Sequence, residues 1–189
     1  TKLESYMLDG HFTATQFLCD VDGHPEQPGL RRALEELELA WIEEPLDAHD
    51  LDGHAALAAQ LVTPVGSGEM LASAADACAF VERGAVDVIM HDAPRIGGIT
   101  PFLQVAEAAR RRGLVLAPHF VMELHIHLAA AYEHVAWVEH FEWLEPLFEE
   151  RLEISGGCIQ VPTQLGLGLS LSERVAGWTL ASDAFGRRG

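Results

Sequence analysis

Short apolar runs alternate with amphipathic segments along the chain from residue 17 onward. Several of these runs, such as "VDVIM" and "LVLAP", are apolar at nearly every position. Continuous apolar runs of this length are typical of strands covered on both faces, as in a parallel sheet. We predict six strands, near residues 17–20, 39–43, 64–68, 87–91, 114–117 and 135–139.

The segments between these strands carry the 3.6-residue period of amphipathic helices. In "LRRALEELELA", leucine or alanine recurs every three or four residues and so occupies one helical face. Ser73 is suited to cap the N-terminus of "AADACAFVERG", and Gly84 stands just beyond its end. Thr100 and Pro101 are suited to the N-cap and first position of the next helix, which Gly113 ends after three arginines.

Regular alternation of strand and helix predicts an α/β fold, a parallel sheet covered by helices, either doubly wound or a TIM-type (β/α) barrel. Neither GxGxxG nor GxxxxGK[ST] follows a strand, so nothing supports nucleotide binding. The Gly-rich segment 151–172 predicts a hairpin and a further short strand. We therefore expect an uncharacterised segment over 1–16, a partial barrel over 17–150 and a β-rich tail over 151–189 that packs on the barrel.

Charge and cysteine content narrow the class of protein. The 29 acidic residues outnumber the 12 basic ones and give a net charge of −17, which argues against nucleic acid or an anionic membrane as a partner. Three scattered cysteines without CxxC spacing suggest a reducing compartment. Because no run approaches 18 apolar residues and no basic leader precedes an apolar one, we expect a cytoplasmic protein.

Every predicted strand ends at an ionisable residue. In a barrel, functional side chains lie at the carboxyl ends of the strands. A single acid at the start of a loop usually contacts solvent or caps a helix, but six ionisable residues in succession are poorly explained in that way. These residues are Asp20, Glu43, Glu69, Asp92, His119 and Glu139.

The first three of these residues predict a metal site. Asp20, Glu43 and Glu69 are oxygen ligands without Cys or His among them, a set that suits Mg²⁺, or alternatively Mn²⁺, better than zinc. Carboxylates about 4 Å apart repel by roughly 4 kcal/mol per pair at an effective dielectric constant of about 20, and a divalent cation reverses that cost. Asp22 is an alternative first ligand. Glu44 points the other way in the strand alternation and is expected at the rim of the site.

The remaining three residues predict acid–base chemistry. An Asp that holds and charges a His is a common way to make imidazole a base near neutral pH, so we interpret Asp92 and His119 as such a pair. Glu139 acts as a hydrogen-bond donor if burial raises its pKa. In "HIH", His125 and His127 are two positions apart and face different ways on a helix, so they do not predict a second metal site.

These residues lie in a set of motifs that resembles the enolase superfamily. The spacings Glu43–Glu69, Glu69–Asp92, Asp92–His119 and His119–Glu139 are 26, 23, 27 and 20 residues. The resemblance covers residues 17–172 and is specific to the C-terminal barrel domain of the mandelate racemase and muconate lactonizing enzyme type. The matching stretches are "WIEEPL", "PVGSGEML", "HDAPRIGGIT", "LAPHF", "HLAAA" and "WVEHFEWLEP".

The resemblance implies a role for each position. Asp20, Glu43 and Glu69 look like the Mg²⁺ ligands. Asp92 and His119 look like the family's dyad, with His119 as general base or acid, in a superfamily that uses a Lys or His base with Mg²⁺. Glu139 looks like the carboxyl group that hydrogen-bonds the substrate. The shared step is removal of a proton alpha to a carboxylate, and the C-terminal "VPTQLGLGLSL" resembles that of sugar-acid (aldonate or aldarate) dehydratases.

The chain also departs from the family pattern. The only lysine is Lys2, so the family's lysine motif is not found, and we expect the capping domain and the first two barrel strands to be missing. Six strands do not close a barrel of about eight, and open edges favour association into a homo-oligomer. The alternatives to a dehydratase are therefore a non-catalytic or truncated barrel fragment and, second, a racemase or epimerase of the same superfamily.

Overall fold

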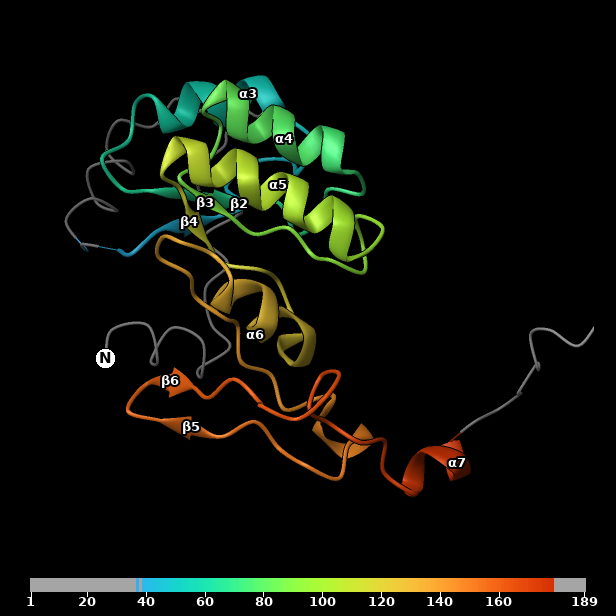
Figure 1. Cartoon of the computed structure of the whole chain (residues 1–189). Coiled ribbons are helices and arrows are strands. Elements are labelled where there is room, and N and C mark those ends of the chain that lie inside the picture. The colour runs from blue at the N-terminus through green and yellow to red at the C-terminus, as the bar shows by residue number, and fades with distance from the viewer. Residues whose placement is uncertain (1–36, 38, 179–189) are drawn as a thin grey trace, which may run out of the picture. The chain divides into compact units, whose positions relative to one another are not determined.

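The computed structural model describes residue 37 and residues 39–178 (Figure 1). The chain divides into two compact units, Thr1–His140 and Phe141–Gly189. The predicted strand near 17–20 lies outside the described residues, and with it lie Asp20 and Asp22.

A four-stranded parallel sheet forms the centre of the first unit. Its order is β1-β2-β3-β4, the order in which the strands follow one another along the chain. Each hydrogen-bonded pair is parallel, as the apolar runs predict. The strands are β1 (Ile42–Glu43), β2 (Val65–Ser67), β3 (Val88–Ile89) and β4 (Val115–Leu116). Four of the six predicted strands are therefore confirmed, each shorter than predicted.

The predicted strand near 135–139 is reduced to one parallel bridge between Ala136 and Leu116. Ala136 packs against the core, but the side chains on either side of it, Val135 and Trp137, are 56% and 42% exposed. The apolar run at 135–139 predicts more pairing than the described part of the sheet provides.

Helices follow the strands, as the alternation predicts. The helices of the first unit are α3 (Leu51–Ala58), α4 (Ala74–Arg83), α5 (Ile99–Arg112) and α6 (Met122–Ala130). Helices α3, α4 and α5 lie side by side over the sheet (Figure 1). The fold class is thus α/β with parallel strands, a partial barrel.

Most predicted helix ends are confirmed. The Ser73 hydroxyl accepts a hydrogen bond from the Asp76 amide at 3.1 Å, and Gly84 ends α4 in the left-handed conformation at φ 70°. Gly113 ends α5 in the same way at φ 68°. The predicted start of α5 is wrong, because the helix begins at Ile99 with Gly98 at the N-cap. Pro101 is tolerated inside the first turn, since N–H groups there have no partner within the helix.

Side chains alternate along each strand, so each face of the sheet has its own apolar cluster. Ile89 and Leu116 contribute to the larger cluster, where they pack with residues of α4 and α5 such as Phe102. We call this side the helix-covered face. Val88 and Met90 belong to a smaller cluster with Ala117, Trp41 and Val115 on the opposite side, which we call the inner face.

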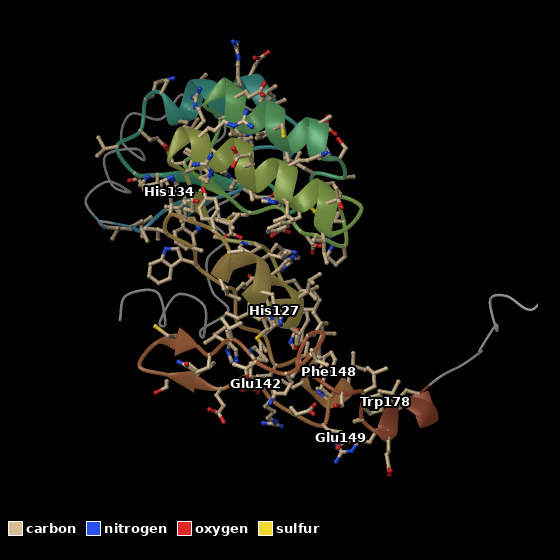
Figure 2. The ribbon with its side chains drawn as sticks, viewed as in Figure 1. His127, His134, Glu142, Phe148, Glu149 and Trp178 are labelled. Carbon is tan, nitrogen blue, oxygen red and sulfur yellow. The ribbon has the colours of Figure 1, made fainter. Side chains whose placement is uncertain are left out.

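The second unit contains the predicted hairpin. Its elements are η2 (Glu145–Leu147), β5 (Ile154–Ser155), β6 (Cys158–Ile159) and α7 (Arg174–Trp178). Gly156 and Gly157, at φ 61° and 78°, form the two-residue turn between the antiparallel strands β5 and β6. Phe148, labelled in Figure 2, forms an antiparallel bridge with Leu171. Among the described residues, no helix is both long and apolar enough to span a membrane.

Candidate active site

Asp92 and His119 are hydrogen-bonded at the carboxyl ends of neighbouring strands. Asp92 lies beyond β3 and His119 beyond β4, and the parallel register Ile89↔Leu116 brings the two segments together. The distance from His119 Nδ1 to Asp92 Oδ2 is 3.2 Å. The other oxygen of Asp92 accepts a hydrogen bond from the Arg95 amide at 3.0 Å. Both oxygens of Asp92 therefore have a partner, which fixes the carboxylate beside the imidazole.

This pairing shifts the pKa values of both groups. The hydrogen bond to Asp92 and the charges of Glu69, Glu139 and Asp92 raise the pKa of His119, against the lowering effect of its partial burial. Burial alone would raise the pKa of Asp92, but the hydrogen bonds from His119 and from the Arg95 amide keep it below its usual value. Asp92 therefore remains charged and favours a proton on His119.

Glu69 lies on the other side of the imidazole. Its Oε2 is 3.7 Å from His119 Nε2, so His119 stands between two carboxylates. Gly68, just before Glu69, has φ 134°, a conformation that favours glycine, and a Cβ atom here would lie 3.2 Å from the His91 amide nitrogen. This close approach of the segments beyond β2 and β3 allows Glu69 to reach His119.

Glu43, at the end of β1, carries the largest pKa shift among the site carboxylates. Burial, with the negative charges of Glu139, Glu69 and Glu44, raises its pKa to about 7. The shift persists despite a hydrogen bond of 3.3 Å from the Trp41 indole nitrogen to Glu43 Oε2. The carboxyl group of Glu43 therefore lies in an environment with an excess of negative charge.

Glu44 directly follows β1, at the position expected at the rim of the site. Its φ of 41° is positive, which is uncommon for a residue other than glycine. Burial and the charge of Glu69 raise the pKa of Glu44, while the amides of Gly68 and Met70 donate hydrogen bonds that lower it. Glu44 thus lies beside the segment that carries Glu69, at the border of the site.

Glu139 lies beside the same histidine from a different segment of the chain. Its Oε2 accepts a hydrogen bond of 2.5 Å from the Phe120 amide, and Phe120 directly follows His119. Burial raises the pKa of Glu139, and the nearby charges of Glu69 and Asp92 add to this effect. A carboxyl group with a raised pKa can hold a proton near neutral pH and donate it in a hydrogen bond.

The donor set fits a hard divalent cation. Glu43 and Glu69 present carboxylate oxygens at the ends of the adjacent strands β1 and β2, and the charge of Glu69 raises the cost of charging Glu43. A cation between them would turn this repulsion into attraction, and oxygen-only ligands suit Mg²⁺ or Mn²⁺. Asp20 and its alternative Asp22 lie outside the described residues.

Four contacts of this site were not predictable from spacing. They are the Trp41 indole on Glu43, the Phe120 amide on Glu139, and two hydrogen bonds of His125 that are described below. The alternation of β1, which puts Trp41 and Glu43 on one face, is a signal for the first. Two of the others, the Phe120 amide on Glu139 and the bond from His125 to the Phe120 carbonyl oxygen, involve the left-handed backbone of Phe120, at φ 56°, for which the sequence has no glycine signal.

Comparison with known proteins gives a family. A family model described as "Enolase C-terminal domain-like" matches residues 14–175. Among curated proteins, the L-talarate/galactarate dehydratase of Salmonella typhimurium is 50% identical over 157 residues, which cover 83% of this chain and 39% of that protein. The N-succinylamino acid racemase of Thermus thermophilus is 33% identical over 162 residues, covering 78% of this chain and 44% of the racemase.

Solved structures agree with this result. The crystal structure of L-talarate dehydratase from Polaromonas sp. JS666, complexed with Mg and L-glucarate, matches with a TM-score of 0.78 and 59% sequence identity. The match covers 80% of this chain and 43% of that one. The chain therefore spans about two fifths of the length of these relatives.

Proposed function

The chain belongs to the enolase C-terminal domain-like family, and on this basis we propose that it supplies the acid–base and metal-binding groups of a Mg²⁺-dependent sugar-acid dehydratase. The reaction would remove the proton alpha to a carboxylate and then expel a hydroxyl group as water. The substrate class is a small sugar acid such as an aldarate, because two similar proteins are dehydratases of talarate or galactarate.

The observation that carries this proposal is the position of His119. Its Nδ1 is 3.2 Å from Asp92 and its Nε2 is 3.7 Å from Glu69. With the proton of Nδ1 donated to Asp92, the lone pair of Nε2 is available to a substrate. A base held in this orientation next to a charged carboxylate is suited to abstract a proton and to retain it.

In the proposed reaction, His119 Nε2 takes the alpha proton, and Asp92 stabilises the imidazolium that forms. The protonated Nε2 then gives its proton to the leaving hydroxyl group, and the resulting enol becomes a 2-keto acid. Glu139 is anchored by the Phe120 amide through Oε2, and its other oxygen can donate a hydrogen bond to the substrate carboxylate.

Glu43, Glu69 and Asp20, with Asp22 as the alternative to Asp20, are the residues that would hold the metal ion. Mg²⁺ when bound stabilises the negative charge that develops on the substrate carboxylate. The raised pKa of Glu43 supports this assignment, because a cation would relieve the crowding of carboxylates that causes the shift.

A racemase or epimerase is the second candidate, supported by the 33% identity with the Thermus racemase. Two-base racemisation needs a second base on the opposite face of the substrate, and the described residues include no lysine. A non-catalytic barrel fragment is the third possibility. A cytoplasmic location and a homo-oligomeric state stay predictions, of which the second follows from the open edges of the sheet.

A single experiment separates these candidates. The purified protein is incubated in D₂O with Mg²⁺ and with galactarate, L-talarate or glucarate, and the products are followed by NMR. We expect loss of water to a 2-keto acid, abolished in His119→Asn. Deuterium exchange at the alpha carbon without loss of water would favour the racemase, and neither reaction would favour the non-catalytic fragment.

A further inference from the structure

His125 is a buried histidine of α6 that hydrogen-bonds to two separate loops. Its side chain is fully buried. Nε2 lies 3.1 Å from the amide nitrogen of Ala93, and Nδ1 lies 3.1 Å from the carbonyl oxygen of Phe120. The ring also stacks on Phe102, with centroids 5.5 Å apart and planes at 23°, which fixes its orientation.

These two partners determine the tautomer of His125. A backbone amide only donates a hydrogen bond, so Nε2 must accept from Ala93 with its lone pair. A carbonyl oxygen only accepts, so Nδ1 must carry the proton that it donates to Phe120. A proton on Nε2, in either the other tautomer or the imidazolium, would point at the Ala93 N–H and break this contact.

The two partners are the direct neighbours of the proposed catalytic pair. Ala93 follows Asp92, and Phe120 follows His119. Phe120 has a left-handed backbone at φ 56°, which is strained for a residue of this size, so its peptide group must be held by other contacts. Its N–H donates to Glu139 and its carbonyl oxygen accepts from His125.

We propose that His125 is a positioning residue, which ties the loop that carries Asp92 to the loop that carries His119 and so sets the hydrogen bond between them. The inference rests on the proposed function of this pair as acid–base groups. His125 does not touch the reacting atoms in this account. It acts through the backbone on both sides of the dyad, and its neutral Nδ1–H form is the one that connects the loops.

His54 is the appropriate comparison because it is as buried as His125 but, among the described residues, connects no two loops. Its ring packs on Phe80 at a centroid distance of 5.4 Å, and its Nδ1 hydrogen-bonds to the Asp50 carbonyl oxygen at the start of its own helix. His127, which is labelled on α6 in Figure 2, is two positions from His125 and lies on a different side of the helix.

The test is NMR of the protein with ¹⁵N-labelled histidine, which needs no activity. We expect His125 in the wild-type protein to have a protonated Nδ1 and an unprotonated Nε2. We expect the Nδ1–H signal of His119, which reports its hydrogen bond to Asp92, to weaken or disappear in His125→Leu. His54→Leu should leave that signal unchanged, and His125→Gln, which can replace one of the two hydrogen bonds, should restore part of it.

Activity provides a second readout, because loss of the His125 contacts should displace Asp92 and His119 from their hydrogen-bonded positions. We expect His125→Leu to lower kcat by up to about 10²-fold with little change in KM, as is usual for small displacements of catalytic groups. A protonated Nε2 in wild-type His125 would overturn the proposal, even if every variant failed to fold. So would an unchanged His119 signal in folded His125→Leu. Absence of the His119 signal in the wild-type protein would instead contradict the proposed function itself.

Discussion

The two faces of the four-stranded sheet differ in what they contribute to the molecule. Among the described residues, the helix-covered face has fifteen buried apolar residues in its cluster, and the inner face has three. Adjacent residues of one strand lie on opposite faces, as Val88 and Ile89 of β3 do. Among the described residues, the charged groups of the candidate site lie beyond β1 to β4, except Glu139, which follows the bridge at Ala136.

The apolar cluster of the helix-covered face mainly stabilises the fold, whereas the strand ends carry the groups for the proposed chemistry. The larger cluster contains fifteen of the eighteen buried residues of the two clusters, and burial of apolar area is the dominant favourable term in folding. The strand ends instead hold several carboxylates whose pKa values are raised by burial, which is unfavourable for folding without a cation. Substitutions in the large apolar cluster should therefore mainly lower stability, and substitutions of the charged groups at the strand ends should mainly lower activity.

The largest effect should come from the site. We expect His119→Asn to lower kcat/KM for the sugar acid by about 10²–10⁴-fold, because general base catalysis contributes that much, and to leave the melting temperature nearly unchanged. His134→Asn is the matched control, since His134, labelled in Figure 2, is exposed and its Nε2 lies 3.1 Å from the Arg110 carbonyl oxygen, away from the candidate site. Steady-state kinetics with both variants would contradict the assignment if the two retained equal activity.

Adjacent residues of β3 and its extension test the helix-covered face against the inner face. Ile89→Ala and Met90→Ala remove side chains of similar size, for which losses of about 2–5 kcal/mol are typical. We expect Ile89→Ala to be near the upper end of that range and Met90→Ala near the lower end. Urea unfolding measures both, and an equal or reversed order would show that the inner face is as important for stability.

Gly66→Ala should produce a smaller loss of stability together with a change at the site. A Cβ atom at Gly66 would lie 2.9 Å from the Trp41 ring and 3.0 Å from the Met90 sulfur. Overpacking of this kind costs about 1–3 kcal/mol, and it would displace the indole that donates to Glu43. We expect weaker Mg²⁺ binding in a folded protein. Unchanged binding would show that the Trp41 contact does not matter.

The smallest expected effect is the contribution of His91, on the helix-covered face, to the pH dependence of the unfolding free energy. His91 is fully buried beside Phe102, and burial lowers its pKa to about 3. Between this value and the unfolded value of about 6.5, the unfolded chain binds a proton that the native protein does not, so stability falls as pH falls.

The slope due to His91 is at most about 1.4 kcal/mol per pH unit. His91→Gln, which can still donate to the Phe102 carbonyl oxygen, should reduce the slope of the unfolding free energy between pH 6.5 and 5. His134→Asn, with its exposed ring, should not. The same slope in wild-type protein and His91→Gln would contradict the burial argument.

Much of this fold could be predicted from the sequence, because strong apolar runs form the strands. Ser73, Gly84 and Gly113 predicted helix ends correctly, since their local chemistry determines them. The run at 135–139 was misleading, because its pairing depends on neighbours that the pattern does not specify. The positive φ of Glu44 also has no local signal in the sequence.

The candidate site was predictable as a set of residues but not as a geometry. Spacing predicted Asp92 beside His119 because both follow strands of one parallel sheet. It did not predict the role of His125, whose partners are backbone atoms of Ala93 and Phe120 and so leave no side-chain pattern. Contacts with backbone atoms depend on the folded loops.

The most direct test of the account is calorimetric titration of the protein with Mg²⁺, beside Glu69→Gln and the exposed control Glu82→Gln, which removes the same charge. We predict saturable one-site binding by the wild-type protein and by Glu82→Gln, and no binding by Glu69→Gln. Absence of binding by the folded wild-type protein, or equal binding by all three, would contradict a metal site at the strand ends.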